Sequence, residues 1–126
     1  MRKIIATKKA PGAVGPYSQA VVSGGFVFTS GQLPMDHETG KFVEGGIQEE
    51  ARQALKNAQA ILEEAGTSLD KAVKVTVFLA DIKDFAAFNE VYAGFFKENP
   101  PARSAYQVAA LPLGARVEIE MIASLE

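Results

Sequence analysis

Short runs of apolar and β-branched residues near the start of the chain predict a β-hairpin. In residues 20–32, "AVVSGGFVFTSGQ", two such runs flank Ser23-Gly24-Gly25. Glycine accepts positive φ angles without steric strain, as a short hairpin turn requires. Residues 34–46, "PMDHETGKFVEGG", are rich in turn-forming and polar residues, so we expect a surface loop that shapes the rim of a site.

Apolar residues at three-and-four spacing predict an amphipathic helix from Ile47 to Ala65. Glu49 and Glu50 lie in its first turn, where the positive end of the helix dipole favours acidic side chains. Gly66 follows the last helical residue, which is typical of a helix C-terminus. The apolar spacing and the residues at both ends therefore predict the same helix.

A second helix is predicted from about Asp84 to Lys97, where aromatic and aliphatic residues form one broad stripe. Asp81 or Asp84 is suited to cap its N-terminus, and Pro100 prevents the helix from continuing. Asn89 lies at the edge of the stripe. An amide in that place needs a hydrogen-bond partner, which is either the backbone or a ligand.

Alternation of side chains predicts three further strands. Residues 71–80, "KAVKVTVFLA", read as a central strand with one wholly apolar face. That face carries Val73, Val75, Val77 and Leu79. Residues 103–109 form the next strand and residues 115–124 the last, in which Glu118 and Glu120 point to one side.

This order of elements predicts a single α+β domain over residues 1–126, with two helices packed on one face of a mixed sheet. The other face is expected to carry Arg103, Ala105 and Gln107, with Glu118 and Glu120 if the strands pair in a suitable register. Phe78 and Ile122 share the phase of the polar members of their strands. A partly apolar face is better covered by another subunit than by water, so we expect a homo-oligomer.

Composition agrees with a globular domain, because 48% of the 126 residues are hydrophobic and 22% are charged. The chain contains no apolar run long enough to span a membrane, and its start lacks the continuous apolar core of a signal peptide. We therefore expect a cytoplasmic protein that does not bind a membrane.

Residue counts exclude several kinds of site. The chain has no cysteine, which rules out disulfides, thiolate metal sites and a cysteine nucleophile. The single histidine, His37, cannot build a metal cluster. The net charge is -2 and the basic residues are scattered, so no nucleic acid partner is expected.

Arg103 is the strongest candidate for chemistry. It follows a proline pair and interrupts a run of small and apolar residues in "NPPARSAYQVAALP", residues 99–112. A guanidinium can hold a carboxylate by two parallel hydrogen bonds, which suits an anionic small molecule. A structural ion pair with Glu118, Glu120 or a neighbouring chain explains the residue equally well.

Three further groups are candidates. Glu118 and Glu120 could supply a general base toward water, although a solvated strand face also explains an acidic pair. Two glycine-containing segments, "GAVGPYSQA" and "TSGQLP", let a ligand approach the backbone, and they place Tyr17, Ser30 and Gly31 on a pocket wall. Turn formation alone also accounts for such glycines.

Four motifs together resemble the RidA (YjgF) family, and their order and spacing cover nearly the whole chain. They are "GPYSQA", "FTSGQLP", "VKVTVFLADIKDFAAFNEVYAGFF" and "PPARSAYQVAALPLGARVEIE". The resemblance implies a chorismate mutase-like α+β fold in a trimeric, barrel-like assembly with sites between subunits. It also implies hydrolytic deamination of 2-imino acids and their enamines, such as 2-iminobutanoate and 2-iminopropanoate, to 2-oxo acids and ammonia.

The resemblance also implies roles for individual residues. Arg103 matches the arginine that holds the substrate carboxylate, and Glu118 matches the acid that activates water. The matching pocket residues are Tyr17, Ser30, Gly31 and Asn89. No metal or cofactor is implied.

Two positions depart from the family pattern. Ala105 stands where many relatives have cysteine, and Gln107 stands where some have glutamate. The first indicates that the chemistry needs no thiol, or that the substrate range differs. Alternatives from other classes are a non-catalytic module that binds metabolites or proteins, and a ribonuclease or translation inhibitor.

Overall fold

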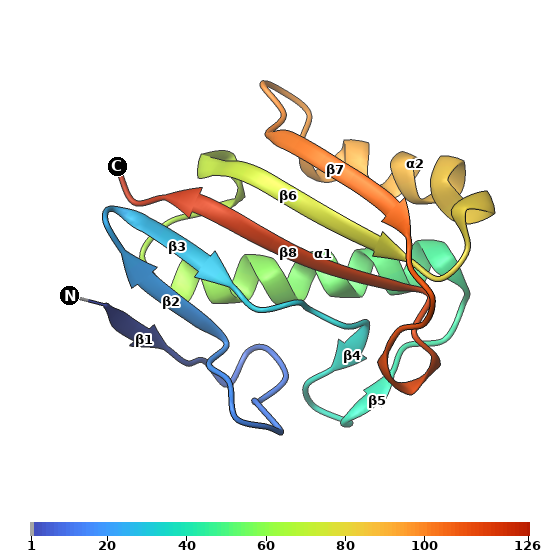
Figure 1. The fold of residues 1–126 in the computed structure, drawn as a ribbon, viewed down its shortest axis with the longest axis horizontal. Helices are drawn as coiled ribbons and strands as arrows, with labels where there is room; N and C mark the ends of the chain where they lie inside the picture. Colours follow the sequence, from blue (N-terminus) through green and yellow to red (C-terminus); the bar gives the residue numbers. More distant parts are fainter. Residues whose placement is uncertain (1) are drawn as a thin grey trace.

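A six-stranded mixed sheet forms the centre of the molecule, in the order β1-β2-β3-β8-β6-β7 (Figure 1). The computed structural model describes residues 2–126. The strands of this sheet are β1 (Lys3–Ile5), β2 (Ala20–Ser23), β3 (Phe26–Thr29), β6 (Ala72–Leu79), β7 (Ala102–Gln107) and β8 (Val117–Ser124). All neighbours pair antiparallel except β6 and β7, which run parallel.

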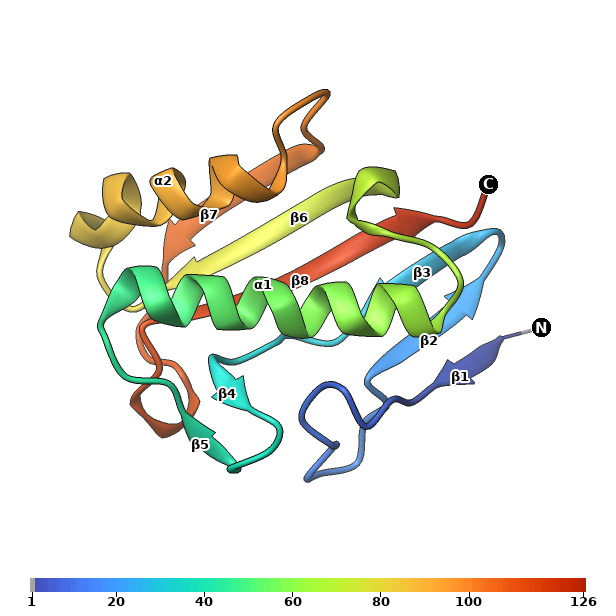
Figure 2. The same ribbon diagram turned by 180° about the vertical axis from the view of Figure 1, so that it is seen from behind.

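Both helices cover the same face of the sheet, which confirms the predicted α+β class. Figure 2 shows α1 (Ile47–Glu64) crossing the sheet and α2 (Phe85–Phe95) lying beside β7. The buried core lies between these layers and is contributed mainly by α1, β6, β8 and α2. Its largest fully buried apolar side chains are Phe88, Leu55, Ile61, Leu62, Leu79, Ile119, Met121, Val27, Val75, Val77 and Val117.

The predicted N-terminal hairpin is confirmed. β2 and β3 pair with Ser23 opposite Phe26, and Gly24 and Gly25 have φ angles of 60° and 83°. Residues 34–46 are more ordered than the expected loop, because β4 (Met35–Asp36) and β5 (Lys41–Phe42) form a small hairpin of their own. Asn57 of α1 stabilises this region by donating to the carbonyl of Met35 at 2.9 Å.

The helix ends follow the predicted signals with one adjustment. After α1, Gly66 has a φ of 94°, and its N–H donates to the carbonyl of Glu63 at 3.1 Å. α2 is shorter than expected and ends at Phe95. Asp81 caps the short 3-10 turn before α2 by accepting from the N–H of Lys83 at 2.9 Å.

One position on β6 departs from the predicted alternation. Val73 is 43% exposed, whereas Val75, Val77 and Leu79 are fully buried. The register between β6 and β8 shifts between Ala72 and Lys74, so the first residues of β6 leave the regular pleat.

The expected phase of β7 was wrong. Arg103 pairs with Val75 and Ala105 with Val77, so these side chains, with Gln107, point to the helix-covered face. Alternation alone could not decide this, because both faces of β7 mix polar and small residues. Glu118 and Glu120, which pair with Phe78 and Thr76, lie on the opposite, open face as expected.

The open face of the sheet is partly apolar. Phe26 and Phe28 of β3 are 40% and 43% exposed, and Tyr106 of β7 is 48% exposed. The rings of Tyr106 and Phe78 pack edge-to-face with their centres 5.7 Å apart. Among residues 2–126, no helix is both long and apolar enough to cross a membrane.

An ion pair between a buried carboxylate and an exposed guanidinium joins α1 to the start of β8. Glu50, 3% exposed, accepts from the backbone N–H of Arg116 at 2.9 Å and from its guanidinium at 2.5 Å. The carbonyl of Arg116 accepts from the N–H of Ala80 at 3.0 Å. Glu50 therefore anchors the segment that leads into Glu118.

Replacing Glu50 by alanine should lower the free energy of unfolding by about 2 to 3 kcal/mol, because a half-buried N–H and a charged partner lose their acceptor. Urea denaturation at a fixed protein concentration measures the change. Glu49→Ala is the matched control, since Glu49 forms an exposed i,i+3 pair with Arg52 and should contribute about 0.5 kcal/mol or less. Equal losses in the two variants would contradict the anchoring role.

Candidate active site

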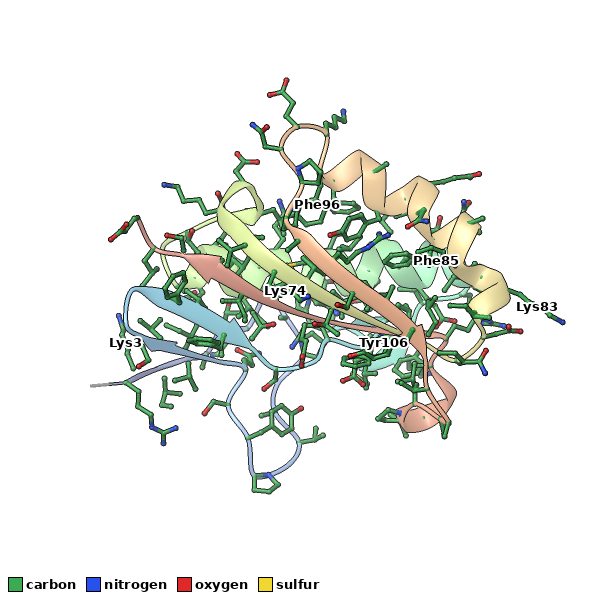
Figure 3. The ribbon with its side chains drawn as sticks, turned by 45° about the horizontal axis from the view of Figure 1, so that its top comes forward. Lys3, Lys74, Lys83, Phe85, Phe96 and Tyr106 are labelled. Carbon is green, nitrogen blue, oxygen red and sulfur yellow. The ribbon has the colours of Figure 1, made fainter. Side chains whose placement is uncertain are left out.

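Arg103 is held in a partly buried place between β7 and α2. Its Nη1 donates to the Oδ1 of Asn89 at 2.8 Å. Its Cζ lies 4.6 Å from the ring centre of Tyr92 and 5.3 Å from that of Phe85. Figure 3 shows Phe85 at the start of α2 and Phe96 beyond its other end. The guanidinium is thus positioned by one hydrogen bond and two aromatic rings.

No carboxylate balances this charge within the part of the chain that the structure describes. The salt bridges found there involve Arg52, Arg116 and His37, not Arg103. Of the two alternatives for Arg103, an ion pair with Glu118 or Glu120 of the same chain is therefore excluded, because those side chains lie on the other face of the sheet. The guanidinium is therefore able to pair with an acceptor from outside the chain.

A hollow of about 480 Å³ lies beside the guanidinium. Its lining residues are Asn89, Tyr92, Ala93, Phe96, Pro100, Pro101 and Arg103. Most of this wall is apolar, which strengthens any charge-assisted hydrogen bond that Arg103 donates. The arrangement is suited to binding a small carboxylate.

Tyr92 lies under Arg103 with its hydroxyl buried and without a hydrogen-bond partner in residues 2–126. Burial raises the pKa of the phenol, and the positive charge of Arg103 opposes that rise. The ring therefore remains neutral near pH 7 and supports the guanidinium through its π face.

Glu118 belongs to a second cluster on the open face of the sheet. Burial raises the pKa of its carboxyl group, and the neighbouring Glu120 raises it further. The Glu118 carboxylate packs directly against Gly31, where a Cβ atom would collide with it. Glycine at position 31 thus leaves the space that the acid occupies.

The other predicted pocket residues surround Glu118. Tyr17, Ser30 and Gly31 line the same hollow of about 460 Å³, together with Val14, Leu33, Pro112 and Leu113. The Oγ of Ser30 donates to the carbonyl of Ser18 at 2.6 Å, which ties two segments of the wall together. A proton acceptor and a tyrosine therefore share one mostly apolar hollow.

The structure does not bring all of the predicted site residues together in one chain. Arg103 and Asn89 form one cluster, whereas Tyr17, Ser30, Gly31 and Glu118 form another. The two clusters belong to opposite faces of the sheet. No group of three His, Asp or Glu side chains in residues 2–126 is placed to hold a metal ion.

Comparison with known proteins identifies the family. A family model described as Endoribonuclease L-PSP matches residues 7–125. The human 2-iminobutanoate/2-iminopropanoate deaminase is 56% identical over 123 residues, which covers 98% of this chain and 90% of that protein. The crystal structure of RidA from Psychrobacter sp. PAMC 21119 is 51% identical, with a TM-score of 0.93 over 97% of this chain and 98% of that chain.

The chain belongs to the RidA family. A further crystal structure with this fold is TdcF of E. coli with bound serine, which is 48% identical and has a TM-score of 0.93 over 97% of this chain and 98% of that chain. The resemblance drawn from the four motifs is therefore confirmed.

Two departures of this RidA sequence have a structural context. Ala105 is half-buried on the same face of β7 as Arg103, so a small apolar side chain lies two residues from the arginine on that face. The Oε1 of Gln107 accepts from the backbone N–H of Ile82 at 2.9 Å. Gln107 thus holds the turn before α2.

Sequence reasoning missed several residues of this RidA site. Tyr92 and Phe85 were assigned only to the aromatic stripe, although a spacing of three or four residues from Asn89 places both beside it on the helix. Pro112 and Leu113 were not singled out, because a Pro-Leu-Gly turn carries no chemical signal. Their contribution depends on how the loop folds back over Glu118.

Glu120→Gln should lower the pKa of Glu118, because it removes the neighbouring negative charge that disfavours ionisation. Burial is the larger cause, so the pKa should still stay above the ordinary glutamate value. A pH titration of the Glu118 carboxyl carbon by NMR measures the shift. Glu38→Gln, at an exposed position, should leave that pKa unchanged, and an unchanged value in Glu120→Gln would rule out the coupling.

Proposed function

We propose that this protein is a 2-iminobutanoate/2-iminopropanoate deaminase that hydrolyses 2-imino acids to 2-oxo acids and ammonia. The observation that carries the proposal is the positioned guanidinium of Arg103, which has no carboxylate partner among residues 2–126. The family and the name of the human relative support the same reaction.

The proposed chemistry needs few groups. Arg103 binds the substrate carboxylate and thereby orients C2 of the imine. Glu118 accepts a proton from a water molecule, whose oxygen attacks C2 and forms the new C–O bond while the C=N π electrons move to the nitrogen, which takes up a proton. The nitrogen of this carbinolamine gains a further proton from Glu118 or solvent, the hydroxyl group loses its proton to form the C=O bond, and the C–N bond breaks so that ammonia leaves. Atoms balance without a cofactor or metal.

The raised pKa of Glu118 is useful for this role. A carboxylate of higher pKa is a stronger base toward water, yet it stays ionised above its pKa. Activity should therefore fall as the pH decreases through that pKa. Tyr17, Ser30 and Gly31 line the hollow beside the base, and Asn89 positions the guanidinium.

We infer that each complete site forms between two copies of the chain in a homotrimer. Arg103 and Glu118 lie on opposite faces of one sheet, so a single small substrate requires them from different subunits. The exposed side chains Phe26, Phe28 and Tyr106 give the open face an apolar surface for such contacts. We place this assembly in the cytoplasm.

RNA cleavage is an alternative activity that the description of the matched family model suggests. The matched family model is described as an endoribonuclease, so RNA cleavage is the second candidate. The net charge of -2 disfavours binding to phosphates. RNA cleavage that persists in pure Arg103→Ala protein would separate that activity from the imine site.

A second alternative is a non-catalytic metabolite-binding module. Such a protein would bind a 2-oxo acid without turning over the imine.

Arg103→Ala should lower kcat/KM for 2-iminobutanoate by about 100-fold, because it removes a charge-assisted bidentate contact worth about 3 kcal/mol. Arg103→Lys should recover only part of the loss, since an ammonium cannot reproduce the planar fork. The assay couples a threonine dehydratase to the protein, with semicarbazide competing for the imine, and measures formation of 2-oxobutanoate.

Arg52→Ala is the matched control, because Arg52 is exposed and pairs with Glu49 on the surface of α1. It should retain the wild-type rate. Full activity in Arg103→Ala, or no acceleration by the wild-type protein, would refute the proposed mechanism.

Mixed oligomers test whether the site is shared. Arg103→Ala and Glu118→Gln subunits should each be nearly inactive alone, since each lacks one half of every site. When equal amounts of the two variants form trimers at random, each trimer that contains both variants has one intact site among its three. The expected activity is about one quarter of the wild-type value per subunit.

Absence of activity in the mixed oligomers would show that both residues act within one chain. Wild-type activity in the Glu118→Gln protein alone would remove Glu118 from the mechanism. Native mass spectrometry of the same samples establishes that mixed trimers are present, because the two variant subunits differ in mass.

A further inference from the structure

Leu113 occupies an unfavourable backbone conformation at the rim of the Glu118 hollow. Its φ and ψ angles are 57° and 23°, in the left-handed region that residues with a Cβ atom rarely adopt. Its side chain is 78% exposed, so it contributes little to the core. Neither the backbone nor the core of this chain therefore benefits from leucine at this position.

The turn that carries Leu113 is held in place on its C-terminal side. The N–H of Ala115 donates to the carbonyl of Pro112 at 3.1 Å, and Arg116 is bound by the buried carboxylate of Glu50. In Figure 1 this loop precedes β8 and lies at the end of the sheet where β4 and β5 lie. Leu113 is thus presented from an anchored turn.

Leu113 lines the same hollow as two other aliphatic residues. Val14, 94% exposed, comes from the segment before β2, and Leu33 comes from the segment after β3. Asn57 of α1 donates to the carbonyl of Leu33 at 3.0 Å and stabilises that wall. Three apolar side chains from separate segments therefore lie beside the carboxyl group of Glu118.

We propose that Leu113, with Val14 and Leu33, binds the carbon chain of the substrate and makes this protein prefer 2-imino acids with longer apolar side chains. The inference rests on the proposed deaminase function. In that reaction the carboxylate faces Arg103 and water lies between C2 and Glu118. C2 carries two further substituents, the imine nitrogen and the side chain, and the mostly apolar wall of the Glu118 hollow suits the side chain better than the polar nitrogen.

The size of the expected preference follows from burial of apolar surface. Each methylene group moved from water into an apolar site favours binding by about fourfold. The wild-type kcat/KM should therefore rise from 2-iminopropanoate through 2-iminobutanoate to 2-imino-4-methylpentanoate. D-Amino acid oxidase supplies each imine from its amino acid, with catalase present and semicarbazide as the competing trap.

Leu113→Gly tests the subsite without straining the turn, because glycine adopts a φ of +57° freely. The variant should lose about tenfold in kcat/KM for 2-imino-4-methylpentanoate, yet stay within about twofold of wild type for 2-iminopropanoate. Leu113→Asn, which also tolerates this conformation, should give the same pattern. Ile82→Ala removes another exposed aliphatic side chain, outside this hollow, and should change neither value.

Three results would overturn the proposal. They are equal losses for all three imines, no chain-length preference in the wild type, or dissociation of the Leu113→Gly oligomer, which would make Leu113 a subunit contact. A merely structural role would also lower the melting temperature of both variants.

Binding of 2-oxo acids separates this proposal from the proposed function. Calorimetry with pyruvate and 4-methyl-2-oxopentanoate needs no turnover. The wild type should bind 4-methyl-2-oxopentanoate more tightly than pyruvate, and Leu113→Gly should abolish this difference. That result would support the subsite even in a protein without deaminase activity. Absence of both turnover and 2-oxo acid binding in the wild type would overturn both proposals.

Discussion

β7 runs parallel to β6 at the edge of the sheet, with Arg103 opposite Val75, and this pairing directs the guanidinium toward α2. A shift of one residue would turn the same side chain onto the open face, the face on which Glu118 and Glu120 lie two strands away. The observed register instead places a permanent charge against two aromatic rings and the amide of Asn89. The contact of α2 with Arg103, and the separation of Glu118 from the guanidinium, both follow from that register.

A positioned charge without an internal partner has a consequence for ligand binding. Burying a guanidinium beside apolar walls is unfavourable unless an acceptor completes its hydrogen bonds. Within residues 2–126 the Oδ1 of Asn89 satisfies one N–H, and the aromatic faces offset part of the lost hydration. A carboxylate ligand would accept hydrogen bonds from the remaining guanidinium N–H groups. The folded chain therefore favours binding of such a ligand.

The acid side of the site depends on a different set of constraints. Glu50 and Arg116 join α1 to the beginning of β8, two residues before Glu118. Gly31 leaves room for the carboxyl group, and the turn at Leu113 lies over it. These contacts come from three separate segments of the chain, and none contributes a reacting atom. Their common effect is a half-buried acid in a mostly apolar hollow, which is the environment that raises its pKa.

The sequence by itself determined the two helices, the five longer strands, the α+β class and the family. Hydrophobic periodicity, the glycine turn at Gly24-Gly25 and the cap at Gly66 are local signals that depend on a few neighbouring residues. The motifs also identified Arg103, Glu118 and their neighbours as a set. Only the tertiary structure decided how that set divides, because strand register and packing depend on residues far apart in the chain. The side of β7 on which Arg103 lies, the close approach of Gly31 to Glu118 and the exposed position of Leu113 are long-range properties, and no local pattern encodes them.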